Sequence, residues 1–377
     1  MALSVHSNSA ASGSCEVEEM DVIPKFDVVS DESDHYFLNS SKSKSDQSAN
    51  TANGVHKKIM QEWRILEKNL PDSIIVRVYE KRIDLLRAAI IGAAGTPYHD
   101  GLFFFDLAFP SDYPARPPLV YYRSFGYRIN PNLYANGRVC LSLVNTWPGR
   151  KGEKWNPKES TMLQVLVSIQ ALVLNEKPYF NEPGYGIWPG KSYWEKKSIA
   201  YNEDVFVISC KSMLLLLRKP PKNFEEFVAA HFRERGNLIL LACKSYANGR
   251  FKAGYFKNDV AGTSSNGNGY STNSFFPSEK LIASLKILYP ELVAAFSRTG
   301  ACLGNSVKQL IVEEKMRKKK KKKSAAMFKK QLSNQVSVMR KTRGVAKVLF
   351  GKFKKVFGLK HGGSAASSGR KQGNVKK

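Results

Sequence analysis

Apolar side chains in the stretch after residue 56 recur every three or four positions. Ile59, Trp63, Leu66 and Leu70 follow this spacing with charged residues between them, and Pro71 comes next. A period of 3.6 residues places such side chains on one face of a helix, and proline ends the helical pattern. The pattern therefore predicts one amphipathic helix at the start of the structured part of the chain.

Four segments rich in β-branched and aromatic residues follow this helix, with turns between them. Gly95-Thr96-Pro97 and Asp100-Gly101 provide turn residues between the second and third segments. Since no helical segment intervenes to connect parallel strands, the order favours an antiparallel meander. The four predicted strands are 73–80, 85–92, 102–109 and 119–122.

A long irregular stretch, about 123–158, comes next and contains many Asn, Gly and Pro residues. A loop of this length inside a compact domain usually carries function. Thr161 and Gln164 then form a capping box that begins a second helix. The side chains expected to face the core from this helix are Met162, Val165, Leu166, Ile169 and Leu172.

Three further segments have a helical pattern, at 193–217, 223–234 and 278–296. The predicted fold class is α+β: an N-terminal helix, a four-stranded antiparallel meander, an active-site loop and C-terminal helices, with a helical C-terminal extension and disordered ends. The predicted organisation is an acidic, Ser-rich disordered head (1–56), a main domain (57–200), a mostly helical extension (201–314) and a basic tail (315–377).

The net charge of +27 is concentrated at one end of the chain. Residues 1–56 hold 9 acidic and 3 basic residues, whereas 315–377 hold 22 basic residues and no acidic one. The charge therefore describes a tail and does not identify the main domain as nucleic-acid-binding. Six consecutive lysines, 318–323, are typical of a nuclear-localisation signal or a polyanion-binding patch, and a disordered solubilising tail explains them equally well.

Apolar residues recur in phase between lysines further along this tail. The pattern predicts a basic amphipathic helix, which suits acidic membranes, calmodulin-like grooves or nucleic acid. Its apolar positions are Val345, Val348, Leu349, Phe353, Val356 and Phe357.

The five cysteines are odd in number, widely spaced and without metal-binding spacing, which favours a reducing compartment. The sequence begins without an apolar signal segment, and no apolar run reaches the length of a membrane span. We therefore expect a soluble protein in the nucleus, the cytoplasm or both, with no metal site.

Three runs of residues carry a more specific signature. They are Gly95-Thr96-Pro97-Tyr98 with Gly101 and Phe103; Phe109-Pro110 with Asp112-Tyr113-Pro114 and Pro117-Pro118; and Asn130-Pro131-Asn132-Leu133-Tyr134 with Gly137 and Val139-Cys140-Leu141. In order and spacing, these runs resemble the ubiquitin-conjugating enzyme family over about a third of the chain. The resemblance is greatest to its large class, which includes the plant phosphate-homeostasis conjugating enzyme and the animal hybrid conjugase–ligase. It implies the family's fold and makes 57–200 the catalytic domain.

The resemblance assigns the chemistry to Cys140, whose thiol would carry ubiquitin as a thioester. A thiolate is both nucleophile and leaving group, and Cys140 has no His or Lys beside it in sequence, which suits a carrier better than a protease. A single cysteine is more often buried and inert, but here the surrounding motif favours catalysis. Asn132 matches the family's catalytic asparagine, which would donate to the oxyanion or brace the loop.

The same resemblance suggests roles for other residues of the active loop. Asn130 replaces a histidine that is usually structural, and with Pro131 and Tyr134 it is expected to shape the loop. Glu182 and Ser142 are candidates for orienting the incoming lysine, although a solvated loop carboxylate explains Glu182 nearly as well.

Two surfaces are expected to meet other proteins of the pathway. Lys57, Lys58 and Arg64 on the first helix match the contact with the activating enzyme, and an ordinary charged solvent face is compatible with them. Ala115 and 156–158 stand where typical members contact the RING domains of ligases. Because an aromatic anchor is replaced by a methyl group at Ala115, we expect little need for a RING ligase.

A segment of the head, 28–34, joins β-branched residues to an acidic cluster. It resembles a SUMO-interacting motif, which adds as a strand to the edge of a sheet. Featureless acidic disorder is the simpler explanation of the same residues.

Together these features predict a ubiquitin-conjugating enzyme without a cofactor of its own, since the upstream activating enzyme uses the ATP. Its expected partners are ubiquitin, the activating enzyme, protein substrates and a ligase, with a polyanion or membrane surface at 315–377 and SUMO at 28–34. Alternative functions are an inactive ubiquitin-binding scaffold, a conjugase for a ubiquitin-like modifier, and nucleic-acid binding through the tail.

Overall fold

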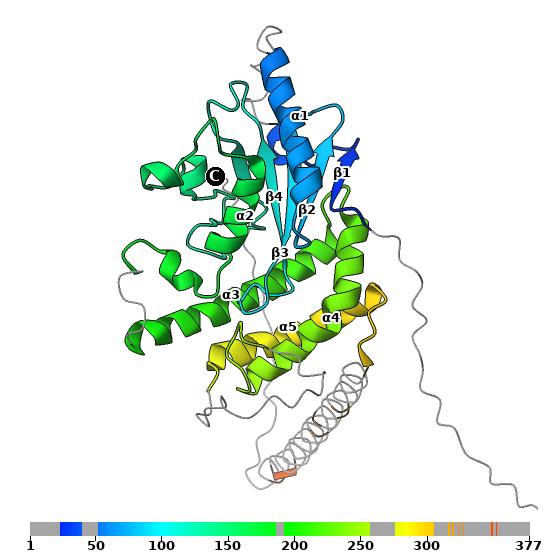
Figure 1. The fold of residues 1–377 in the computed structure, drawn as a ribbon. Coiled ribbons are helices and arrows are strands. Elements are labelled where there is room, and N and C mark those ends of the chain that lie inside the picture. Colours follow the sequence, from blue (N-terminus) through cyan, green and yellow to red (C-terminus); the bar gives the residue numbers. More distant parts are fainter. Residues whose placement is uncertain are drawn as a thin grey trace, which may run out of the picture. The chain divides into compact units, whose positions relative to one another are not determined.

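A five-stranded sheet forms the centre of the protein in the computed structural model (Figure 1). The structure describes residues 23–39, 52–185, 192–256 and 276–304, with isolated helical positions between 316 and 352. None of the described helices is long and apolar enough to cross a membrane. The strands lie in the order of the chain: β1 (Phe26–Val29), β2 (Ile74–Tyr79), β3 (Leu85–Ile91), β4 (Leu102–Ala108) and β5 (Leu119–Tyr122).

Strands β2 to β5 form the antiparallel meander that the sequence predicts. Val76 pairs with Ala88, Ala88 pairs with Phe105, and Leu107 pairs with Val120. Alternate residues of each strand face the same side of the sheet, so this register gathers one apolar set on one face. The predicted strand boundaries are confirmed to within about two residues.

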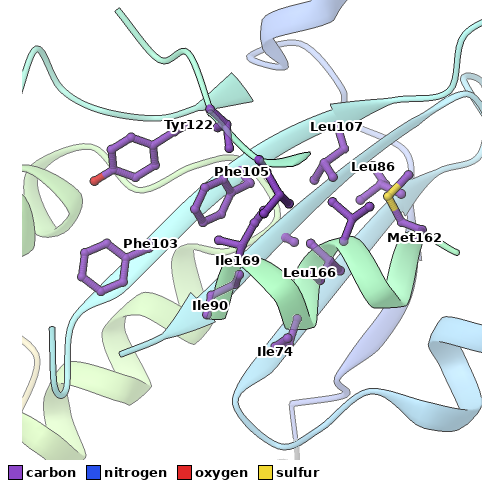
Figure 2. Close-up of a cluster of buried hydrophobic side chains, with 14 of the residues drawn as sticks. Ile74, Leu86, Ile90, Phe103, Phe105, Leu107, Tyr122, Met162, Leu166 and Ile169 are labelled. Atoms are coloured by element: carbon purple, nitrogen blue, oxygen red, sulfur yellow. The ribbon is translucent and has the colours of Figure 1, made fainter. Parts of the chain in front are cut away.

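Helices α1 (Ala52–Asn69) and α2 (Met162–Ser168) cover that face. In Figure 2, Met162 and Leu166 of α2 and Ile169 just after it point at side chains of the strands. Thr161 caps α2 in a capping box with Gln164, as the sequence predicts. The core of this layer joins both helices to the sheet, with Ile59 and Leu66 from α1 and Ile74, Leu86, Ile90, Phe103, Phe105 and Leu107 from the strands.

The end of α2 differs from its predicted pattern. A π-helical turn, Ile169–Val173, follows directly on Ser168. This turn has more residues than an α-helical one, so it changes which side chain meets the core. Val173 is buried and Leu172 is 63% exposed. The prediction that Leu172 faces the core is therefore wrong.

The acidic head is ordered over 23–39, where disorder was predicted. Strand β1 lies parallel to β2 at the edge of the sheet, with Val28 paired to Val78, and a short 3-10 helix, η1 (Tyr36–Asn39), follows. Helix α1 also begins earlier than expected, at Ala52. We call residues 23–39 the N-terminal strap. Val28 and Val29 of the segment that resembles a SUMO-interacting motif, 28–34, belong to the chain's own sheet, and binding of SUMO to this segment stays a prediction.

Ionic and aromatic contacts hold the strap against β3, β4 and β5. The Asp34 carboxylate accepts from Arg87 (2.6 Å) and Arg123 (3.0 Å). His35 is buried and its Nε2 donates to a carbonyl of β3 at 3.0 Å. Tyr36 stacks on Tyr121 of β5, with 3.5 Å between ring centroids. The strap is thus part of the folded domain.

Three long helices form the extension: α3 (Ser192–Arg218), α4 (Glu225–Ala247) and α5 (Glu279–Arg298). The predicted domain boundary at residue 200 falls inside α3, so the extension is not a separate unit. Phe224 packs edge-on against Phe104 of β4, and Arg77 of β2 lies over the Phe224 ring at 5.2 Å. The extension therefore covers the second face of the sheet, which explains why β2, β3 and β4 are buried on both faces.

A polar cluster joins the β3–β4 turn to α4. His99 Nδ1 contacts Asp100 at 2.8 Å, and Tyr246 of α4 contacts His99 Nε2 at 2.9 Å. Arg235 pairs with the Asp100 carboxylate at 2.7 Å, while His231 donates to the Asp100 carbonyl. Each buried polar group in this cluster has a partner, as a stable interface between two elements requires.

Residues 309–377 form a second unit that is almost entirely outside the described residues. The lysine run, 318–323, and the predicted amphipathic helix, 345–357, belong to it. Val348 and Leu349 are among its few described positions; both are helical and exposed.

Candidate active site around Cys140

Cys140 and Asn132 face each other across two short segments of the active loop. The Cys140 N–H donates to the Asn132 carbonyl at 2.9 Å. In return, Asn132 Nδ2 donates to the Cys140 carbonyl at 2.8 Å. The two residues that the sequence singled out are therefore held together by a reciprocal pair of hydrogen bonds.

The Asn132 amide braces the loop in this conformation. Its Nδ2 is occupied by the Cys140 carbonyl, while its buried Oδ1 has no partner among the described residues. A buried acceptor without a partner costs free energy, so the amide is not held by all its available bonds. It can turn toward a new acceptor beside Cys140 if that acceptor offers a stronger bond.

The Cys140 side chain is less accessible than the chemistry requires, since only 1% of the residue is exposed. Thr146 helps to close the loop: its Oγ1 accepts from Leu141 N at 2.9 Å and donates to the Val139 carbonyl at 2.7 Å. In this conformation of the loop, a protein-sized partner has no access to the Cys140 thiol.

Asn130 forms the anchor of the loop. Its Nδ2 donates to the Tyr98 hydroxyl and to the Val173 carbonyl, both at 2.7 Å, and its Oδ1 accepts from Asn132 N at 2.8 Å. The side chain is fully buried. Its Oδ1 also accepts from Asn181 Nδ2 at 3.4 Å. The amide thus makes four bonds here, and it connects the loop to the β3–β4 turn and to the end of the π-helical turn.

Pro131 and Tyr134 are held by one arginine. Arg128 donates to the Pro131 carbonyl at 3.1 Å and lies over the Tyr134 ring at 4.5 Å. The same guanidinium pairs with Glu182 at 3.4 Å, and both side chains are well exposed. Glu182 is thereby linked to the loop, although its charge is shared with Arg128.

Ser142 lies in a different environment from Glu182. Its Oγ donates to the carbonyl of Pro148 at 3.1 Å. A side chain added at Gly149 would come within 2.5 Å of Ser142 Oγ and 3.0 Å of Glu153 Oε2. The carboxylate beside Ser142 is therefore Glu153, which sequence analysis did not select. Both residues line a groove of about 420 Å³ that reaches α2.

The two expected protein-binding surfaces are exposed, with one exception. Lys57 and Arg64 are exposed on α1, whereas Lys58 pairs with the buried Glu62 at 3.6 Å. Glu62 also accepts from the Tyr113 hydroxyl (2.7 Å) and from Met162 N (3.0 Å), and so ties α1 to the start of α2. Lys58 therefore contributes to the packing of the two helices as well as to the surface.

The two loops expected to meet RING domains lie next to each other. Trp155 Nε1 donates to the Pro114 carbonyl at 2.7 Å, which brings Ala115 close to 156–158. Ala115 and 156–158 are all exposed, and none of them is aromatic. Among the residues that the structure describes, no three His, Cys, Asp or Glu side chains are grouped so that they could hold a metal ion.

Comparison with known proteins agrees with the signature and the fold. The sequence model of the family described as ubiquitin-conjugating enzyme matches residues 58–203. A relative named ubiquitin-conjugating enzyme E2 38, from Arabidopsis thaliana, is 57% identical over 225 residues, which cover 60% of this chain and 68% of the relative. The chain belongs to the ubiquitin-conjugating enzyme family.

Two further relatives place it in the large class of ubiquitin-conjugating enzymes. Ubiquitin-conjugating enzyme E2 24 of Arabidopsis thaliana is 53% identical over 276 residues, or 73% of this chain. The human dual E2 ubiquitin-conjugating enzyme/E3 ubiquitin-protein ligase BIRC6 is 40% identical over 210 residues, or 53% of this chain. The chain spans only 29% of the former and 4% of the latter. The alignment to E2 24 extends well beyond 58–203, so this relative also shares residues outside the region that the family model matches.

Proposed function

We propose that this ubiquitin-conjugating enzyme carries ubiquitin as a thioester on Cys140 and transfers it to lysines of substrate proteins. The observation that carries the proposal is the reciprocal pairing of Cys140 and Asn132 within the family's active loop. This pairing places the Asn132 amide beside Cys140, which is a free cysteine.

In the first step, the Cys140 thiolate attacks the thioester carbon of ubiquitin on the activating enzyme, and the thiol of that enzyme leaves. In the second step, the neutral amine of a lysine attacks the thioester on Cys140. The Asn132 amide turns from the Cys140 carbonyl to the oxyanion that forms, the Cys140 thiolate leaves, and the amine proton passes to solvent. Glu182, Ser142 and Glu153 are the groups proposed to orient the lysine.

The test uses the full chain with activating enzyme, ATP and ubiquitin, separated on a gel without reductant. We expect an adduct of ubiquitin size that thiol reductant removes. Cys140→Ala should form none, and Cys140→Ser should form an oxyester that resists reductant, because an alkoxide is a poorer leaving group than a thiolate. Cys243→Ala, a matched change of a buried cysteine in α4, should load normally.

The alternatives predict different results in the same experiment. A wild-type chain that binds ubiquitin but never forms the adduct would be a scaffold and not an enzyme. An adduct formed only with a ubiquitin-like modifier and its activating enzyme would change the substrate and keep the mechanism.

The finer parts of the proposal concern cofactors, partners and location. We propose that the chain needs no cofactor of its own, because ATP is consumed by the activating enzyme. The small side chain at Ala115 supports transfer with little need for a RING ligase. The 22 basic residues of 315–377 support a nuclear or cytoplasmic location and binding of this tail to a polyanion or an acidic membrane.

The tail's role can be tested apart from the enzyme's. Binding of the full chain to heparin or to anionic vesicles should fall steeply as salt rises, because each contact releases counterions. A chain that ends at residue 314 should lose that binding and still form the thioester. Equal binding by both chains would refute the role of the tail.

A further inference from the structure

A second groove lies beside the active loop, between the N-terminal strap and β5. Its volume is about 530 Å³. Tyr36 of the strap, Pro118, Val120 and Tyr121 around β5, and Arg138 and Thr146 of the active loop are among its lining residues. We call it the β5 groove. The strap, which sequence analysis treated as disordered, therefore supplies part of its wall.

The β5 groove reaches the immediate neighbours of Cys140. Thr146 lines it and is hydrogen-bonded through Oγ1 to Val139 and Leu141, the residues on either side of Cys140. Arg138 lines it two residues before the cysteine. A chain lying in this groove would therefore have its next residues close to Cys140.

The edge of β5 away from β4 is bridged to the active loop at Tyr121, opposite Arg138, and the strand continues beyond this bridge toward Leu119. Tyr122 N–H points away from β4 and donates to the Gly137 carbonyl at 2.8 Å. Peptide groups two residues apart in a strand point the same way, so the Val120 N–H also points away from β4, and Val120 lines the groove. Proteins commonly bind extended peptides by adding them to such an edge.

The charge of the lining selects an acidic occupant. Arg116 and Arg138 are the only charged residues that line the groove, and both are exposed. Arg116 pairs with the exposed Asp112 at 2.6 Å. The Arg138 guanidinium lies 5.9 Å from the centre of the Tyr134 ring and forms no ion pair in the described part of the chain, so it can still pair with a carboxylate from outside.

We propose that the β5 groove binds an extended acidic segment of the substrate protein and so selects lysines that have Asp or Glu close by in sequence. The proposal rests on the proposed transfer from Cys140 to lysine. Arg138 contacts the carboxylates, the Val120 N–H contacts the peptide backbone, and the ring of Tyr36, which is half exposed and stacked on Tyr121, packs against the segment.

The test compares acceptors for the loaded enzyme. Three synthetic peptides of equal length carry one lysine flanked by Asp and Glu, by Ser and Asn, or by Arg, and free lysine is the fourth acceptor. We expect the acidic peptide to have the lowest KM, with the preference weakening as salt is raised, because the ion pairs lie at the surface. Discharge to free lysine should depend little on salt.

Two variants and one control connect the preference to the groove. Arg138→Glu should raise KM for the acidic peptide by about two- to fivefold, the scale of one exposed ion pair, and leave discharge to free lysine unchanged. Tyr36→Ala should raise KM for all three peptides. Lys286→Glu makes the same charge change on the exposed side of α5, outside the groove, and should alter none of these values.

The outcomes separate this inference from the proposed function. If no thioester forms, the proposed function fails. If the thioester forms and discharges to free lysine, but the three peptides react equally or Arg138→Glu and Lys286→Glu behave alike, the β5 groove does not select acidic segments. A preference for the Arg-flanked peptide would equally overturn the inference.

Discussion

Replacing Asp34 by asparagine removes one charge from the contact that holds the strap. The carboxylate accepts from Arg87 at 2.6 Å, from Arg123 at 3.0 Å and from the backbone N–H of Lys222 at 3.3 Å. Asparagine has nearly the same shape, so the strap can keep its path. Arg87 keeps its bonds to Asp106, at 2.5 and 3.0 Å, and is not left without a partner.

The expected loss follows from these contacts. A hydrogen bond to a charged group contributes about 1.5–3 kcal/mol to the free energy of unfolding. The Asp34 side chain is 24% exposed and asparagine retains one acceptor, so we expect a loss of about 1–2 kcal/mol after allowing for screening by solvent. For a domain of this size, each kcal/mol lowers the melting temperature by about 2–4 °C.

The pKa of Asp34 determines how this loss of stability changes with pH. Burial opposes ionisation of Asp34, but Arg87 and Arg123 outweigh it and lower the pKa of the carboxyl group below its ordinary value. A carboxylate of lowered pKa stabilises the folded state above the pKa of the unfolded chain, about 3.9, and this stabilisation is lost as the pH falls through the folded pKa. The difference between wild type and Asp34→Asn should thus be full at neutral pH and shrink below about pH 4.

Urea unfolding at several pH values measures this difference. Asp72→Asn is the matched control: Asp72 also pairs with a residue of the strap, Lys25, at 2.9 Å, but it is 99% exposed. Exposed pairs contribute about 0–1 kcal/mol, so this variant should lose much less. Equal losses for the two variants, or a loss for Asp34→Asn that does not change with pH, would refute the reasoning.

Three further predictions concern the active loop and the ligase surface. Asn132→Ala should load ubiquitin onto Cys140 normally and discharge it to lysine on the order of 100- to 1000-fold more slowly; if single-turnover assays show both steps falling together, the amide is only a brace. Gly137→Ala should destabilise the fold by more than about 1 kcal/mol in urea unfolding, because its φ of 86° and the Tyr121 ring, 2.0 Å from the new Cβ, both exclude a side chain. Gly152→Ala is the control: its new Cβ would lie in open space, so the free energy of unfolding should change little. Ala115→Phe should increase discharge stimulated by generic RING domains; strong stimulation of the wild type by several such domains would contradict the weak contact inferred from the methyl group.

Local sequence patterns predicted the elements that local interactions determine. The meander and the capping box of Thr161 depend on alternation, turn residues and a four-residue motif, all visible in sequence. Strand β1 was missed because only four residues form it, and its partner, β2, begins 45 residues after β1 ends. The exposure of Leu172 was missed because the π-helical turn has no marker in the helical periodicity.

In the candidate site, the sequence predicted the residues that lie within the recognisable motif and missed those outside it. Cys140 and Asn132 are eight residues apart in a recognisable run, and the structure joins them by two hydrogen bonds. Glu153 was missed because it lies after Leu141, where the runs that carry the resemblance end. The structure buries Cys140, and sequence spacing carries no information on its burial.

The strap also has consequences for the order of events during synthesis. Val76, which pairs with Phe26 of the strap, is synthesised 50 residues after it. Lys222, whose N–H bonds to Asp34, is synthesised 188 residues after Asp34. At about 5–20 residues per second, that interval is about 10–40 s. A nascent chain can therefore pair β1 with β2 and bond Asp34 to Arg87 and Arg123 long before α4 exists, and the extension adds the last of the strap's contacts. A ribosome-bound chain that lacks the extension would hold the strap through β2 to β5 alone, so we expect proteases to cut the strap faster there than in the complete domain.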